Sequence, residues 1–108
     1  MSDYKQQYWQ LRLDEVKKAL EDNNFAAHVV QTPQEARELV LMELLPALAP
    51  ASMSWGGSLT FRDTGLYDAL KPDAAPENVE VIDTYDKSQG PEMALERRRQ
   101  ALLVDLFF

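Results

Sequence analysis

The feature that most constrains the fold of this 108-residue chain is an alternation of helical and strand-like segments. Helical signals mark residues 4–22, 33–45, 59–62, 66–70 and 91–103, and short apolar runs mark residues 25–30, 51–55 and 79–83. Strands that alternate with helices are typically joined by crossovers, which make neighbouring strands parallel. The pattern therefore predicts an α/β fold, a parallel sheet with flanking helices.

The clearest local signal is Thr32-Pro33-Gln34-Glu35. A threonine N-cap, a proline at the first helical position and a glutamate three residues after the threonine form a capping box. We expect a helix to begin at Pro33. Pro46 is expected to end or kink it near Leu45, because proline has no N–H to donate to the preceding turn.

The last five residues, 104–108, are apolar and aromatic, whereas chain termini are usually polar and exposed. They predict another buried strand, either a docked end or part of a longer domain, and we favour the second interpretation. The chain is then one incomplete domain over residues 1–108. It has an N-terminal helix over 1–24 and a β-α-β-α-β-α portion over 25–108. A partial sheet leaves an edge strand uncovered, so we expect a homo-oligomer.

Charge and composition exclude several classes of function. The chain has 11 Lys and Arg against 18 Asp and Glu, a net charge of −7, which argues against nucleic acid or an anionic membrane as a partner. It has no cysteine and one histidine, so thiolate and His-rich metal sites are excluded and we expect no metal or cofactor. No apolar run suits a membrane span or a signal peptide, which predicts a cytoplasmic protein.

The best functional candidate is Gly56-Gly57-Ser58, which follows a predicted strand and precedes a predicted helix. Glycines allow positive φ and a close approach of a ligand to the backbone. N–H groups at a helix start favour an anion, and Ser58 either caps the helix or binds that ligand. The alternative is an ordinary strand-to-helix turn. The loop thus predicts a site for a small anionic metabolite.

Three further residues are candidates beside this loop. Thr60 adds a hydroxyl group. Arg62, four residues after Ser58, shares its helix face and suits a carboxylate or phosphate, although a solvated arginine paired with a nearby aspartate is the alternative. Asp83 ends a predicted strand, where ligands of open α/β sheets bind, and the alternative is a cap for the next loop.

Two other features are interpreted as structural. Arg97-Arg98-Arg99 is the one basic run, and three consecutive helical positions spread over about 200°, so it predicts a solvated helix face. His28 lies between apolar residues of the predicted strand 25–30. It is interpreted as a packed core residue.

Two blocks of the chain resemble the LUD (lactate-utilisation) domain family, over roughly residues 32–108. They are Ser54-Trp55-Gly56-Gly57-Ser58-Leu59-Thr60, continued by Gly65-Leu66 and Ala69-Leu70, and Val81-Ile82-Asp83, continued by residues 97–107. Asp63-Thr64 departs from the Glu-Ile expected there.

The resemblance implies a fold similar to that of ribose-5-phosphate isomerase and the CoA-transferases, with only the N-terminal half of the domain present. It also implies a role in bacterial oxidation of lactate to pyruvate, as a component without an iron–sulfur cluster that works with iron–sulfur partner proteins. One alternative is an enzyme that binds a sugar phosphate, nucleotide or CoA ester. Another is an interaction module with a vestigial pocket. Whether the chain is an enzyme stays open.

Overall fold

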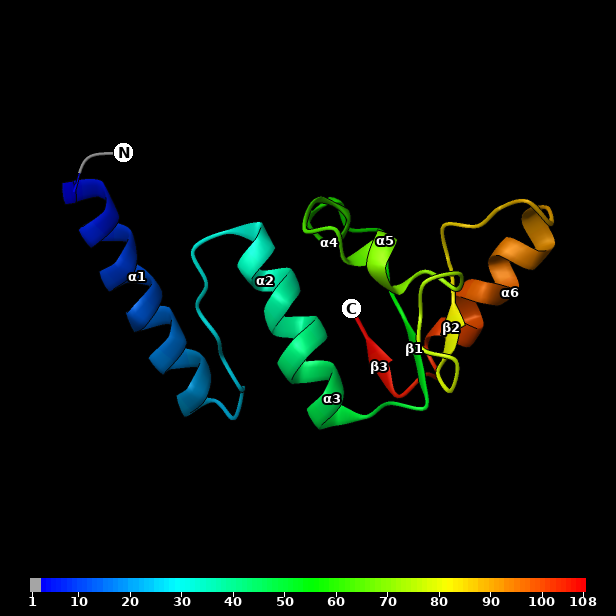
Figure 1. Ribbon diagram of the computed structural model, residues 1–108, viewed down its shortest axis with the longest axis horizontal. Helices are drawn as coiled ribbons and strands as arrows, with labels where there is room; N and C mark the ends of the chain where they lie inside the picture. The colour runs from blue at the N-terminus through cyan, green and yellow to red at the C-terminus, as the bar shows by residue number, and fades with distance from the viewer. Residues whose placement is uncertain (1–2) are drawn as a thin grey trace. The chain divides into compact units, whose positions relative to one another are not determined.

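The computed structural model describes residues 3–108, which form two compact units divided between Gln31 and Thr32. The first unit contains helix α1 (Asp3–Asp22) and the segment that follows it. The second contains every other helix and all the strands (Figure 1).

Helix α1 confirms the predicted N-terminal helix within the described residues and ends in a Schellman motif. Asn24 has a left-handed backbone conformation (φ 69°). The N–H of Phe25 donates to the carbonyl of Leu20 (3.0 Å), and that of Asn24 donates to the carbonyl of Glu21 (3.1 Å). These bonds satisfy carbonyls that the helix end leaves without partners.

The prediction of a strand over residues 25–30 is wrong. This segment forms no strand, Phe25 is 61% exposed, and His28 is exposed rather than packed in a core. Val30 instead lines a hollow with Trp9 and Leu13 of α1. An apolar run becomes a strand only where another strand offers backbone partners, and the first unit contains none within its described residues.

The second unit begins with a continuous helical rod made of α2 (Pro33–Leu39), the π-helical segment η1 (Val40–Leu44) and α3 (Leu45–Leu48). The predicted capping box is confirmed, because Thr32 Oγ1 accepts the N–H of Glu35 (3.1 Å). The expected end near Leu45 is wrong. A wider π turn, in which the N–H of Leu45 bonds the carbonyl of Val40, precedes Pro46 and lets the rod accommodate the proline ring.

Three strands form the sheet: β1 (Ser52–Ser54), β2 (Glu80–Ile82) and β3 (Leu106–Phe107). The order is β2-β1-β3 and both pairings are parallel, which confirms the predicted α/β fold and places a strand in each of the apolar runs 51–55, 79–83 and 104–108. Met53 is in register with Val81 on one side and Leu106 on the other. Figure 1 shows β1 between its two neighbours.

Helices join the strands as crossovers and cover the sheet. Helices α4 (Leu59–Asp63) and α5 (Leu66–Leu70) join β1 to β2, and α6 (Pro91–Ala101) joins β2 to β3. The core lies on one face, where Met53 and Trp55 pack with α4, α5 and the helical rod. On the other face, α6 packs against β2, and the buried hydroxyl of Ser54 donates to the carbonyl of Ile82 (2.7 Å).

Between residues 3 and 108, none of the helices combines the length and the apolar character that a membrane span requires.

Replacing Ala49 with glycine is expected to stabilise the second unit. Ala49 ends α3 in the left-handed conformation (φ 45°), where a Cβ costs about 1 kcal/mol, and its side chain is exposed. We expect Ala49→Gly to raise the free energy of unfolding by about 0.5–1 kcal/mol. The same change at Ala94, within α6, should lower it by about 0.5–1 kcal/mol. Urea denaturation measures both, and a loss of stability in Ala49→Gly contradicts the assignment.

Candidate functional site

The carboxyl ends of the three parallel strands meet at one edge of the sheet. Residues 55–58 follow β1, and residues 83–85 follow β2. A hollow of about 490 Å³ opens there, which we call the carboxyl-edge hollow. It is lined by Trp55, Gly56, Gly57, Thr84, Tyr85, Lys87, Arg98, Leu102 and Phe107. In open α/β sheets ligands bind at this edge.

Hydrogen bonds occupy most of the backbone of the glycine loop. The N–H of Gly56 donates to the carbonyl of Phe108 (3.1 Å), and the N–H of Ser58 donates to the hydroxyl of Tyr85 (3.3 Å). That hydroxyl donates to the carbonyl of Gly56 (2.9 Å). Within the described residues the N–H of Gly57 makes no hydrogen bond. The loop therefore offers one free amide, that of Gly57, rather than the row of amides expected from the sequence.

Gly57 has no structural reason to be glycine. Neither Gly56 nor Gly57 has a positive φ, so the loop does not use the positive φ that glycine allows. A Cβ added at Gly57 meets no atom within 4 Å, whereas one added at Gly56 lies 3.4 Å from Cζ of Phe107. The missing side chain at Gly57 leaves bare backbone on the lining of the carboxyl-edge hollow.

Ser58 caps helix α4, and Thr60 lies outside the carboxyl-edge hollow. Ser58 Oγ accepts the N–H of Phe61 (3.1 Å), so Ser58 is the N-cap that the sequence offered as one of its two roles. Thr60 is exposed on α4 and does not line the hollow. Because α4 has only five residues, its dipole adds little to anion binding.

Arg62 contacts an aromatic ring rather than the hollow. Its guanidinium carbon lies 5.7 Å from the centroid of the Tyr85 ring, within the range of a cation–π interaction. It makes no ion pair with Asp63 or Asp68 in the described part of the chain. Arg62 therefore supports Tyr85, which in turn bonds the glycine loop.

Asp83 uses both carboxylate oxygens within the protein. Oδ2 accepts the hydroxyl of Tyr67 (2.8 Å), and Oδ1 accepts the N–H of Tyr85 (2.9 Å). The geometry matches the cap offered as the alternative role of Asp83. Burial, and after it the hydrogen bond to the Asp83 carboxylate, raises the pKa of Tyr67 to about 12.

Two cations on the hollow were not among the candidate binding residues predicted from the sequence. Lys87 follows β2 and Arg98 belongs to α6, and both are exposed. Neither side chain makes an ion pair or a hydrogen bond within residues 3–108. Lys87 could have been recognised as a candidate because it follows the predicted strand 79–83. No signal separated Arg98 from the two arginines beside it.

The neighbours of Arg98 are engaged elsewhere. Arg98 and Arg99 are exposed, as the predicted solvated helix face requires, whereas the prediction is wrong for Arg97. Arg97 is partly buried, lies 3.2 Å from the Asp86 carboxylate and donates to the carbonyl of the same residue (2.8 Å). Arg99 pairs with Glu96 (3.6 Å). Hydrogen bonds from Ser88 hold the pKa of Asp86 below its usual value, and the charge of Arg97 lowers it further.

An aromatic cluster underlies the loops at this edge. The ring centroid of the fully buried Trp55 lies 5.1 Å from that of Phe61 and 5.5 Å from that of Tyr67. The Tyr67 and Tyr85 rings lie 4.8 Å apart. Aromatic pairs at these separations add to the stability gained from burial. The cluster therefore holds Tyr85 against the glycine loop.

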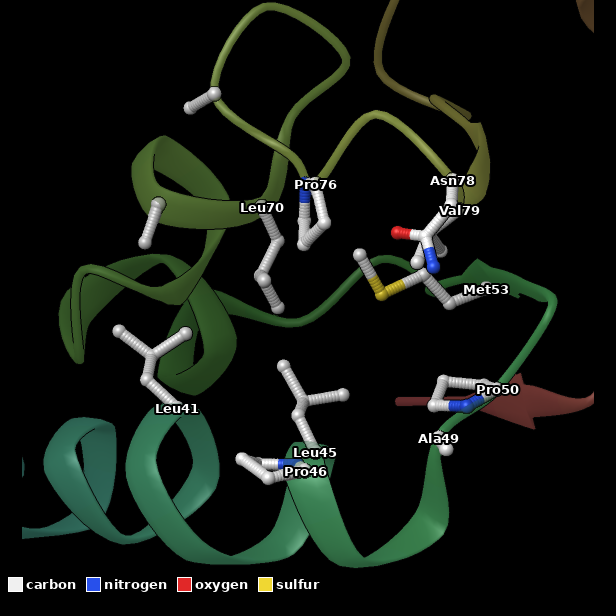
Figure 2. Close-up of a pocket in the computed structure, with 12 residues that line it drawn as sticks. Leu41, Leu45, Pro46, Ala49, Pro50, Met53, Leu70, Pro76, Asn78 and Val79 are labelled. Carbon is white, nitrogen blue, oxygen red and sulfur yellow. The ribbon is translucent and has the colours of Figure 1, made fainter.

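A second cavity, of about 440 Å³, lies near the residues that precede β1 and β2 (Figure 2). Figure 2 shows Leu41 and Leu45 of the helical rod pointing toward Leu70 of α5 across it. Its lining carries no charged side chain, and its one polar side chain is the amide of Asn78. Its position away from the carboxyl edge and its apolar lining make it the weaker candidate for an anion.

Among the described residues, no group of three or more His, Cys, Asp or Glu side chains converges to hold a metal ion.

The fold and the hollow define an α/β protein whose parallel sheet opens on a partly cationic pocket at its carboxyl edge. The chain belongs to the LUD domain family, which matches residues 13–108. The match confirms the family resemblance and extends into α1. No curated protein and no solved structure matches the chain.

The Tyr67–Asp83 hydrogen bond predicts a loss of stability in alkali. Because folding raises the pKa of Tyr67 from 10.0 to about 12, its contribution is fully present below pH 10 and is lost as pH rises through 12. Tyr67→Phe should cost about 1.5–3 kcal/mol at neutral pH, and that difference from wild type should shrink between pH 10 and 12.

Urea denaturation across this pH range measures the effect. Tyr4→Phe is the control, because Tyr4 is 85% exposed on α1 and its phenol has no part in this network. A difference between wild type and Tyr67→Phe that stays constant up to pH 12 contradicts the assigned role of the hydrogen bond.

Proposed function

We propose that this LUD-domain chain is the component without an iron–sulfur cluster of a bacterial system that oxidises lactate to pyruvate. Its proposed location is the cytoplasm. Membership of the LUD domain family supports the link to lactate utilisation. The sequence has no cysteine to bind a cluster, so iron–sulfur partner proteins are proposed to carry the electrons.

The proposed contribution of this chain is to bind a small anionic metabolite at Gly56-Gly57-Ser58. The observation that carries this proposal is Gly57, which lines the carboxyl-edge hollow, has open space where a side chain would fit, and has an N–H that makes no hydrogen bond within the described residues. Neither backbone conformation nor packing requires glycine at that position. A ligand that approaches the backbone closely does require it.

The remaining candidate residues are proposed to act through this loop. Ser58 fixes the start of α4, while Asp83 and Arg62 hold Tyr85, whose hydroxyl bonds the loop on both sides of Gly57. Thr60 lies outside the lining, and we assign it no contact with the ligand. The ligand then meets Gly56 and Gly57 directly, and the other residues position them.

A second candidate function is an enzyme that binds a sugar phosphate, a nucleotide or a CoA ester. The volume of the hollow favours it, since about 490 Å³ exceeds what a three-carbon acid fills and is typical of metabolite sites. The lining contains no histidine and no carboxylate, the side chains that most often act as a general acid or base; its titratable groups are Tyr85 and Lys87 beside Arg98. We therefore propose binding rather than catalysis as the role of these residues.

Substitutions at Gly57 test the proposed site. Isothermal titration measures the binding of lactate, pyruvate, inorganic phosphate, glucose 6-phosphate and acetyl-CoA. We expect Gly57→Asp to weaken the binding of whichever of these anions the wild type binds by tenfold or more, because it places a negative charge against the ligand. Gly57→Asn, which has nearly the same shape and no charge, should weaken it less.

Circular dichroism confirms that both variants fold, as the open space at Gly57 predicts. If Gly57→Asp leaves every affinity unchanged, the loop is not the site. If the wild type binds none of these anions, the chain is instead an interaction module with a vestigial pocket.

We also propose that the chain is a homo-oligomer. Apolar side chains on α1 are exposed, with Tyr4 at 85%, Leu11 at 66% and Val16 at 50%, and exposed apolar surface of this kind promotes association. Light scattering should give a mass above 12.3 kDa, and Leu11→Asp should shift the mass toward that of a monomer. A monomer at every concentration tested contradicts this proposal.

A further inference from the structure

We infer that the ligand of the carboxyl-edge hollow carries two negative charges and an apolar portion, and that Lys87 and Arg98 bind its charged end. The inference rests on the proposed function, since it concerns the same hollow. It adds the chemical class of the ligand and two residues that recognise it. Phosphate monoesters and dicarboxylates share this chemistry.

Lys87 and Arg98 are the two basic residues on the lining of the carboxyl-edge hollow. Acidic residues outnumber basic ones by seven, and the two arginines beside Arg98 are both paired with carboxylates. Lys87 and Arg98 have no such partners within residues 3–108 and line the same hollow. An anion with two charges satisfies both cations, whereas an anion with one charge leaves a cation uncompensated.

Neighbouring contacts tie together the two backbone segments that carry the cations. Lys87 lies in the segment between β2 and α6, and the residue before it, Asp86, bonds to Arg97 of α6 through both its carboxylate and its backbone carbonyl. The contact therefore joins the segment to α6 through Asp86 and Arg97, each of which is the residue before one of the two cations. Because the backbone is already held, the ordering cost of binding falls mainly on the two exposed side chains.

The apolar portion of the ligand is inferred from two exposed side chains on the same lining. Leu102 is 77% exposed and Phe107 is 50% exposed, and both lie on the hollow with the cations. A ligand with an aromatic or aliphatic body removes part of this surface from water while its charged end meets Lys87 and Arg98. A purely polar anion, such as inorganic phosphate, has no apolar portion to cover Leu102 and Phe107.

The test uses three probes that share an aromatic ring. Phenyl phosphate and phthalate carry two charges at pH 8, and benzoate carries one. Isothermal titration against the whole chain should show phenyl phosphate or phthalate binding at least tenfold more tightly than benzoate. The probe that binds more tightly shows whether a phosphate monoester or a dicarboxylate suits the hollow.

Matched variants assign the effect to the two cations. Lys87→Gln and Arg98→Gln should each weaken the tighter probe at least fivefold. Lys71→Gln and Arg99→Gln make the same change of charge at positions outside the lining and should stay within twofold of wild type. Leu102→Ser should weaken binding, while Leu103→Ser, at a neighbouring 85% exposed position, should not.

Each outcome separates this inference from the proposed function. Equal affinity for benzoate and both dianions overturns the inference, as does equal weakening by the test and control variants. If an anion binds and Gly57→Asp abolishes its binding while Lys87→Gln and Arg98→Gln do not weaken it, the proposed function stands and the inference fails. If no probe binds and none of the anions tested at Gly57 binds, both fail.

Discussion

The parallel pairing of β1 with a strand on each side is the interaction on which the rest of the second unit depends. Although β1 has only three residues, its backbone bonds β2 and β3 in register. The alternation of side chains along it sends Met53 and Trp55 into the core and Ser54 to the opposite face. Parallel pairing also brings the ends of all three strands to one edge, so residues that follow different strands share the carboxyl-edge hollow.

The tyrosine between the two loops links the sheet to the proposed site. Tyr85 bonds the loop after β1 through its hydroxyl and the residue after β2 through its N–H. Asp83 accepts the N–H of Tyr85, and the guanidinium of Arg62 lies against the Tyr85 ring. Both residues therefore contact Tyr85 rather than the hollow. Asp83 and Arg62, which the sequence predicts as ligand contacts, thus hold Tyr85 against the glycine loop, and the backbone of Gly57 has open space beside it.

The elements that depend on local sequence were predictable, and those that depend on distant partners were not. The capping box at Thr32 and the strand-helix alternation carry their own geometry, so the start of α2 and the parallel sheet were predicted correctly. The run at 25–30 has strand composition but no strand beside it, and Pro46 follows a π turn that periodicity does not specify. The loop at Gly57 was found from its glycines. Arg98 could not be recognised in the same way, because the sequence does not show which of the three adjacent arginines pair with carboxylates. In the fold, Arg97 and Arg99 form such pairs and Arg98 does not.

A cationic pocket in a chain of net charge −7 has a physical consequence for selectivity. The overall negative field disfavours every anion at long range, although salt screens it beyond about 10 Å at moderate ionic strength. Lys87 and Arg98 act at short range, where their attraction for a bound anion is largest. In the proposed site, an anion that reaches both cations is attracted more strongly than an anion that reaches one of them. Against the net negative charge, anions that contact only part of the proposed site are therefore bound more weakly than anions that contact both cations.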